Sequence, residues 1–191
     1  KFRDPAVAGL FYAAEREVLS NTISKFLKNS FPPKIPEAKA LIAPHAGYSC
    51  SGQVAASAYI NWQDQRKSIE RVVLVGPAHR VAFKGIAIPS VDAFQTPLGK
   101  VFLDKEALST LVELPYIFLA DESHRQEHSI EVHLPFLQEV LGDFKLIPLL
   151  VGSISYEKVA NVLDLFWRDQ STRFLISTDL SHYHDYEYAM K

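Results

Sequence analysis

The stretch Arg71–Gly76, RVVLVG, decides the fold class of this 191-residue chain. Every residue between its two ends is valine or leucine, so the stretch has no polar face, which is typical of a strand covered on both sides. Such strands belong to parallel sheets that carry helices on both faces. Three other apolar runs have the same character: ALIA (40–43), FKLIPLLVG (144–152) and RFLIST (173–178).

Segments with helical periodicity alternate with these strands. In EREVLSNTISKFLKN (15–29), apolar residues recur at the spacing of one helix face. In EHSIEVHLPFLQEVLG (127–142), Pro135 interrupts the apolar stripe and predicts a kink or a late helix start. Further helices are expected at GQVAASAYINW (52–62), capped by Ser51, at DKEALSTLVE (104–113) and at SYEKVANVLDLFWRD (155–169).

Weaker signals complete the organisation. GIAIP (85–89) and KVFL (100–103) read as short strands joined through the turn signal QTPLG, and SFPPKIPEAK (30–39), with three prolines, reads as a loop. The sequence shows no repeat and no domain boundary. Strands that alternate with helices predict a single layered α/β domain over residues 1–191.

The composition is that of an ordinary globular protein, with 48% apolar residues, 22% charged residues and a formal net charge of −2. This balance argues against a nucleic-acid interface. The single cysteine, Cys50, cannot form an internal disulfide, fits a reducing compartment and is expected to be a small buried apolar residue. The opening residues lack a signal-peptide layout and no apolar run reaches membrane-spanning length. We therefore expect a cytoplasmic protein without a membrane or nucleic-acid partner.

Polar residues follow directly after the strands that are expected to be buried. His45 follows ALIA, His79 follows RVVLVG, Ser153 follows KLIPLL, and Asp179 and His182 follow RFLIST. The carboxyl ends of parallel strands meet at one edge of a sheet, where ligands bind in open α/β folds. The sequence therefore predicts that these residues converge on one cleft.

The chemistry of this group points to a divalent transition metal. Two histidines and a carboxylate, with open positions, describe both non-heme iron sites and zinc hydrolytic sites. His45 and His79 are the natural pair, and we expect their rings to lie close enough to share one ion. Asp179 or Glu127 could supply an oxygen ligand, and His182 could be a third ligand or a general acid–base.

The remaining histidines have plainer interpretations. His124 and His184 are expected to be solvated, and His133 to lie at the surface or at the edge of the core. Glu127, beside His128, either caps the helix or orients a metal-bound histidine from behind. A helix that starts near Ser51 would favour a neutral His45 and would attract anions.

Seven ordered motifs resemble the Memo family, which is named for a mediator of cell motility and whose microbial members are described as AmmeMemoRadiSam system proteins. They are PAVAGLFY, IAPHAGYSCSG, LVGPAH, FQTPLG, EHSIEVHLPFLQ, IPLLVG and STDLSH, and together they span essentially the whole chain. The resemblance implies similarity to class III extradiol (LigB-type) dioxygenases. It thus implies a three-layer α/β/α sandwich around a mostly parallel or mixed sheet, with a mononuclear non-heme iron site.

The resemblance also assigns roles to single residues. It makes His45 and His79 metal ligands, places Asp179 and His182 in the same pocket, and places Glu127 and His128 at its border. The remaining ligand of the family is a cysteine in a C-terminal segment, and Cys50 cannot be that residue by position. We therefore expect the natural chain to continue beyond Lys191.

Three functions remain open at this point. The first is a metal-dependent oxidoreductase, dioxygenase-like, that acts on a small phenolic or heterocyclic substrate, with His182, Asp179, Glu127 and His128 as its catalytic group. Iron is the expected metal, and copper or zinc would also fit. The second is a non-enzymatic module that binds phosphorylated or other anionic ligands in the same cleft, although the sequence lacks a clustered arginine pocket. The third is a zinc-type amide hydrolase.

Overall fold

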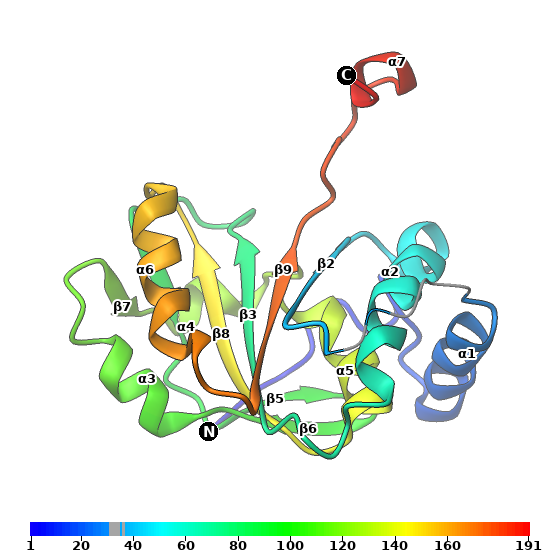
Figure 1. Cartoon of the computed structure of the whole chain (residues 1–191), viewed down its shortest axis with the longest axis horizontal. Coiled ribbons are helices and arrows are strands. Elements are labelled where there is room, and N and C mark those ends of the chain that lie inside the picture. The colour runs from blue at the N-terminus through cyan, green and yellow to red at the C-terminus, as the bar shows by residue number, and fades with distance from the viewer. Residues whose placement is uncertain (31–34, 36) are drawn as a thin grey trace.

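The computed structural model describes residues 1–30, 35 and 37–191, and its centre is a six-stranded mixed sheet (Figure 1). In spatial order its strands are β2 (Ala40–Ala43), β9 (Thr172–Ser177), β3 (Arg71–Pro77), β8 (Lys145–Val151), β4 (Ile86–Ile88) and β7 (Ile117–Leu119). The first four strands run parallel to their neighbours, and β4 is antiparallel to β8. The four apolar runs of the sequence are therefore adjacent strands that end at one edge.

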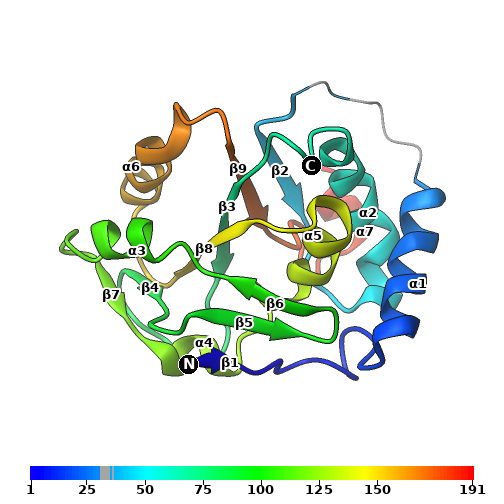
Figure 2. The same ribbon diagram turned by 90° about the horizontal axis from the view of Figure 1, so that it is seen from below.

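Helices cover both faces of this sheet, which gives the expected three-layer α/β/α sandwich. On one side lie α3 (Lys105–Leu111) and α6 (Tyr156–Trp167) (Figures 1 and 2). The other side carries α1 (Arg16–Lys28), α2 (Tyr48–Gln63) and α5 (Leu134–Leu141), which pack on one another. The short helices are α4 (Asp121–Arg125), the 3₁₀ helix Glu131–His133 and α7 (Tyr186–Ala189). No helix in the described ranges is long and apolar enough to cross a membrane.

A second, three-stranded sheet lies below the first and was only partly predicted. Its order is β1 (Phe2–Arg3), β5 (Ala93–Thr96) and β6 (Gly99–Phe102), with β1 parallel and β6 antiparallel to β5. The turn expected at QTPLG is the β5–β6 connection, where Gly99 adopts a φ of +133°. Since β1 pairs with β5, this sheet fixes the N-terminal residues to the body of the molecule.

A buried ion pair extends that attachment. The Glu131 carboxylate is fully buried and accepts hydrogen bonds from Arg3 Nη1 (2.7 Å), from the backbone N–H groups of Ala6 and Val7, and from the Tyr12 hydroxyl (2.6 Å). Arg3 also donates through Nε to the carbonyl of His124 and through Nη2 to that of Glu127. The N-terminal segment is therefore tied to the stretch 124–131.

Several boundaries and burials differ from the expectation. Helix α2 begins at Tyr48 and not after Ser51, whose hydroxyl instead donates to the Ala46 carbonyl inside the first turn. Strand β2 is the edge strand and is buried on one face only: Leu41 and Ala43 are buried, whereas Ile42 is 59% exposed. Cys50 is exposed and not buried. Residues 31–34 and 36 of the loop predicted at 30–39 lie outside the described residues.

The late helix start after residue 127 is confirmed. A 3₁₀ turn precedes α5, and Pro135 occupies the first turn of α5, where its missing N–H costs no helical hydrogen bond. The residues before that start, 127–130, run along the end of β3. The Ser129 hydroxyl donates to the Pro77 carbonyl at 2.8 Å, which brings Glu127 and His128 to the sheet edge.

Candidate metal centre

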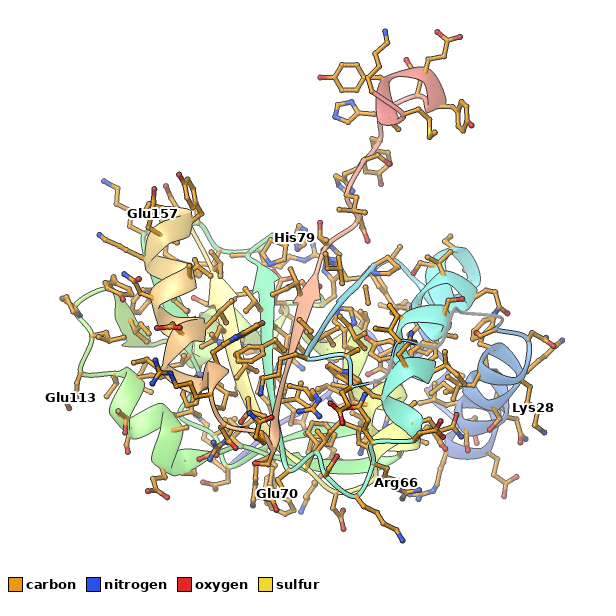
Figure 3. The ribbon with its side chains drawn as sticks, viewed as in Figure 1. Lys28, Arg66, Glu70, His79, Glu113 and Glu157 are labelled. Carbon is orange, nitrogen blue, oxygen red and sulfur yellow. The ribbon has the colours of Figure 1, made fainter. Side chains whose placement is uncertain are left out.

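Three of the four loops that follow the parallel strands meet at one edge of the sheet. His45 follows β2, His79 follows β3 and Asp179 follows β9, and these strands are neighbours in the order β2–β9–β3. Figure 3 shows His79 at this edge, from which the C-terminal segment also departs. The loop after β8 turns away, because Gly152 and Ser153 bond to the backbone of residues 83–85.

Three histidines form a compact cluster at this edge. Each of His45, His79 and His128 offers a ring nitrogen that lies within 4.8 Å of those of the other two. The ring centroids are 5.0 Å apart for His45 and His79, 5.5 Å for His45 and His128, and 4.6 Å for His79 and His128. Imidazole nitrogens at such distances can converge on one ion.

His45 is buried and is held on two sides. Its backbone N–H donates to Asp179 Oδ1 (2.8 Å), and its ring Nδ1 is hydrogen-bonded to Ser177 Oγ (2.7 Å). Its other ring nitrogen, Nε2, lies 3.5 Å from Asp179 Oδ2. Burial lowers the pKa of His45 to about 4, against the opposing effect of Asp179. The ring is therefore neutral at pH 7, which is the form that binds a metal.

His79 is oriented by the buried carboxylate of Glu127. The Glu127 oxygens accept hydrogen bonds from His79 N–H (2.6 Å), His79 Nδ1 (2.9 Å), His128 N–H (3.0 Å) and Ser129 N–H (3.0 Å). Burial alone would raise the pKa of the Glu127 carboxyl, but the hydrogen bonds from His79 and Ser129 lower it to about 2. Glu127 is therefore an ionised acceptor behind His79, an arrangement that leaves His79 Nε2 open.

His128 has a buried polar atom that lacks a hydrogen-bond partner among the described residues. Its Nδ1 lies 3.3 Å from Glu127 Oε1 but is not aligned for a hydrogen bond. Its ring packs on Phe11, with centroids 4.8 Å apart. Burial lowers the pKa of His128, and Glu127 offsets only part of that effect. A buried, unpaired ring nitrogen is costly, so the donor set of this cluster fits a bound metal ion.

The two residues expected from the Asp-x-x-His pattern occupy different depths. Asp179 lies beside His45, with its side chain 18% exposed, whereas His182 lies at the rim with its side chain 57% exposed. The two are linked by a distance of 3.6 Å between Asp179 Oδ2 and His182 Nδ1. The structure thus brings Asp179 to the histidine cluster and leaves His182 on the solvent side.

Two histidines are more buried than expected, since His124 was expected to be solvated and His133 to lie at the surface or at the edge of the core. His124 is 2% exposed and its Nε2 shares a hydrogen bond with the Ala87 carbonyl (2.9 Å), so the expected solvated position is wrong. His133 is 1% exposed, and its Nε2 is bonded to Ser177 Oγ (2.8 Å) directly behind His45. His184 is exposed, as expected. The signal in the sequence that could have identified Ser177 is its position two residues before Asp179, because residues two apart lie on the same side of a strand.

Comparisons with known proteins show which sequences this chain resembles. The family profile described as "Memo-like protein" matches residues 3–191. The chain is 37% identical over 196 residues to a MEMO1 family protein of Aquifex aeolicus, which covers all of this chain and 71% of that protein. It is 36% identical over 187 residues to the Protein memo-1 homolog of Caenorhabditis elegans, which covers 95% of this chain and 53% of that protein. A MEMO1 family protein of Methanobrevibacter smithii is 34% identical over 205 residues, with coverages of 99% and 72%.

Proposed function

The chain belongs to the Memo-like protein family, and we propose that it binds one divalent transition-metal ion between His45, His79 and His128. The observation that supports this proposal is that one ring nitrogen from each histidine lies within 4.8 Å of those of the other two. Two of the rings have Nδ1 engaged, by Ser177 and by Glu127, which leaves Nε2 available on each. Neutral imidazoles with one nitrogen fixed from behind are the usual form of a protein metal ligand.

The same electrostatics make an anion-binding role the weaker alternative. A phosphate group needs positive charge, but burial lowers the pKa of both His45 and His128, so both rings are neutral at pH 7. The ionised Glu127 carboxylate lies directly behind the cluster and would repel an anion. A cation would instead gain from this negative charge.

We assign the bound ion an enzymatic role, namely oxidoreductase chemistry on a small phenolic or heterocyclic substrate. Iron is the proposed metal because we expect similarity to extradiol dioxygenases, and three histidines also suit zinc or copper. When bound, the metal would supply Lewis-acid or redox activation at the open side of the cluster. Glu127 holds His79 in place, and Asp179 holds the backbone of His45. In this proposal His182, at the exposed rim, exchanges a proton between a substrate, solvent and the Asp179 carboxylate.

Metal content tests the site. Protein purified without added metal is analysed by elemental mass spectrometry, stripped with chelator and titrated anaerobically with Fe²⁺, and separately with Zn²⁺ and Cu²⁺. We expect one ion per chain, and loss of binding in His45→Ala, His79→Ala and His128→Ala with the circular dichroism unchanged. His184→Ala is the matched control, because this histidine is exposed and outside the cluster. Failure of the intact chain to bind any of the three ions at one per chain would refute the site.

Activity separates the chemical alternatives. Iron-loaded protein is screened for oxygen uptake with catechol-like and heterocyclic compounds, and zinc-loaded protein for amide hydrolysis. Uptake that depends on His182 supports the oxidoreductase. Hydrolysis by the zinc form alone would replace it with the amide hydrolase, and phosphopeptide binding that is insensitive to chelator would replace both with the binding module.

A further inference from the structure

We infer that Ser177 is a positioning residue that fixes the tautomer of His45, so that Nδ1 carries the proton and Nε2 faces the cluster unprotonated. The inference rests on the proposed metal site for its functional meaning. The geometry that carries it lies entirely within the described residues. Three groups surround the Ser177 oxygen: the Ser129 carbonyl, the His45 ring and the His133 ring.

The single hydroxyl proton of Ser177 is committed to Ser129. The Ser129 carbonyl oxygen lies 2.7 Å from Ser177 Oγ and can only accept. The proton between these two oxygens must therefore come from Ser177. This leaves the two lone pairs of Ser177 Oγ as acceptors for the remaining partners.

The two imidazoles must then both donate to Ser177. His45 Nδ1 lies 2.7 Å and His133 Nε2 lies 2.8 Å from Ser177 Oγ, and a ring nitrogen that faces an acceptor oxygen carries a proton. A neutral His45 with the proton on Nδ1 has its lone pair on Nε2. Because Ser177 occupies Nδ1, Nε2 is the nitrogen of His45 that remains for a metal.

The far side of His133 gives an independent check. If His133 Nε2 donates, the neutral ring must accept at Nδ1, and the Tyr59 hydroxyl is hydrogen-bonded to that atom. Burial lowers the pKa of His133 to about 3 and raises that of Tyr59 well above its ordinary value. Both groups are therefore neutral, and the proton directions from Tyr59 through His133 to Ser177 are mutually consistent.

Ser177 competes with Asp179 for the His45 proton. Asp179 Oδ2 lies 3.5 Å from His45 Nε2 and would stabilise the opposite tautomer, with the proton on the nitrogen that the metal needs. The shorter contact to Ser177 decides the competition in favour of Nδ1. Removal of the Ser177 hydroxyl leaves Asp179 as the acceptor beside the ring, so the proton should move to Nε2.

The first test is a ¹⁵N NMR measurement on the metal-free full chain, labelled at histidine. Long-range ¹H–¹⁵N couplings assign the tautomer of each ring directly, and a purely structural role for Ser177 would not move it. We expect the Nδ1–H tautomer for His45 and the Nε2–H tautomer for His133 in the unsubstituted chain, and a shift of His45 towards Nε2–H in Ser177→Ala. An Nε2–H tautomer of His45 in the unsubstituted chain would overturn the inference without any variant, so it stays testable even where Ser177→Ala does not fold.

The second test measures metal affinity by competition with a chromophoric chelator, using Zn²⁺ and Co²⁺. Loss of such a supporting hydrogen bond lowers metal affinity by roughly 10–100-fold, and we expect that range for Ser177→Ala. Ser51→Ala is the matched control: it also removes a buried hydroxyl, which bonds to the Ala46 carbonyl beside His45 but touches no imidazole. Equal losses of metal affinity in both variants would mean that Ser177 only stabilises the loop in a general way, and would overturn the inference.

The two proposals fail in different ways. If the unsubstituted chain binds no metal but shows His45 as Nδ1–H, the metal site is refuted and the role of Ser177 in setting the tautomer stands. If the chain binds metal and Ser177→Ala keeps both its affinity and the His45 tautomer, the metal site stands and this inference is refuted.

Discussion

Glu127 accepts two hydrogen bonds from His79, one from the backbone N–H to Oε2 (2.6 Å) and one from ring Nδ1 to Oε1 (2.9 Å). The same residue therefore sets both the position of the His79 backbone and the rotation of its ring. Because Glu127 is 48 residues away in sequence, the loop after β3 depends on a distant segment for its conformation.

Glu127→Gln should weaken metal binding by about 10–100-fold, the range typical of residues that support a ligand. A side-chain amide nitrogen cannot accept, so at least one of the bonds to His79, His128 or Ser129 is lost. Chelator competition measures the effect. Glu122→Gln is the control, because that glutamate is exposed and its carboxylate bonds to the surface residue Arg125. Equal affinities for the two variants would contradict the role of Glu127.

His182→Ala should leave metal affinity within about twofold, since the side chain is at the exposed rim and outside the cluster. It should lower turnover, or the affinity for a substrate-like ligand, if the rim handles a proton. Metal titration and the oxygen-uptake assay are run on the same preparation. Loss of metal with an intact fold would make His182 a ligand instead.

The free energy of unfolding should fall as the pH drops from about 6.5 towards 4. Burial lowers the pKa of His45 and His124 to about 4 and that of His133 to about 3, so in this range the unfolded chain binds protons that the folded chain excludes. Each such group contributes up to about 1.4 kcal/mol per pH unit within its window. Urea denaturation of metal-free protein at several pH values measures the slope.

His124→Gln should flatten that slope, because it removes one buried titrating group while an amide nitrogen can still donate to the Ala87 carbonyl. The exposed His184 provides the control, since His184→Gln should leave the slope unchanged. A stability that is independent of pH across this range would show that these rings are not buried in solution.

Arg3→Ala should lower the free energy of unfolding by about 3–5 kcal/mol, because it leaves the fully buried Glu131 carboxylate without its cation. It also frees the carbonyls of His124 and Glu127. Urea denaturation at pH 7 measures the loss. Arg125→Ala, which breaks an exposed pair with Glu122, should cost far less. A comparable cost for both variants would mean that the N-terminal segment is not anchored as described.

Gly76→Ala should destabilise the fold by about 1–3 kcal/mol and weaken metal binding. A Cβ at this position would lie 2.8 Å from Ser129 Oγ and 2.9 Å from Ile130 Cδ1, so the side chains of Ser129 and Ile130, next to His128, must move. Gly47→Ala is the matched control near the same site, because its Cβ would meet only ordinary contacts at 3.5 and 3.6 Å. Thermal unfolding compares the stability of the two variants, and chelator competition compares their metal affinity. Equal effects in both variants would contradict the prediction.

The elements of this fold that can be predicted from the sequence are the strands that are completely buried. In β3 the interior residues are buried on both faces, so apolar composition alone marks the strand and its parallel setting. That setting was enough to bring His45 and His79 to one edge, because adjacent parallel strands end together. Strand β5 was missed since its sequence AFQT is short and half polar, and β1 was missed since it has two residues.

The interior of the site depends on pairings that sequence patterns do not encode. His128 precedes the helical segment, so no periodicity fixes the direction of its ring relative to the sheet. The contacts of His133 with Tyr59 and Ser177 span 74 and 44 residues, and only the packed fold determines them. From its own sequence segment such a histidine is predicted to be exposed, and only the packing of the segment against the strand shows that it is buried.

The position of β9 between β2 and β3 has a consequence for how the protein is made. His45 and His79 follow β2 and β3, which come early in the chain. Between these two strands lies β9, which supplies Ser177 and comes about a hundred residues after β3. At a synthesis rate of about 5–20 residues per second, β9 is made several seconds after β3. Pairings between segments so distant in sequence also slow folding. Until β9 is made, the edges of β2 and β3 that it joins keep unpaired backbone N–H and C=O groups, which can pair with other chains.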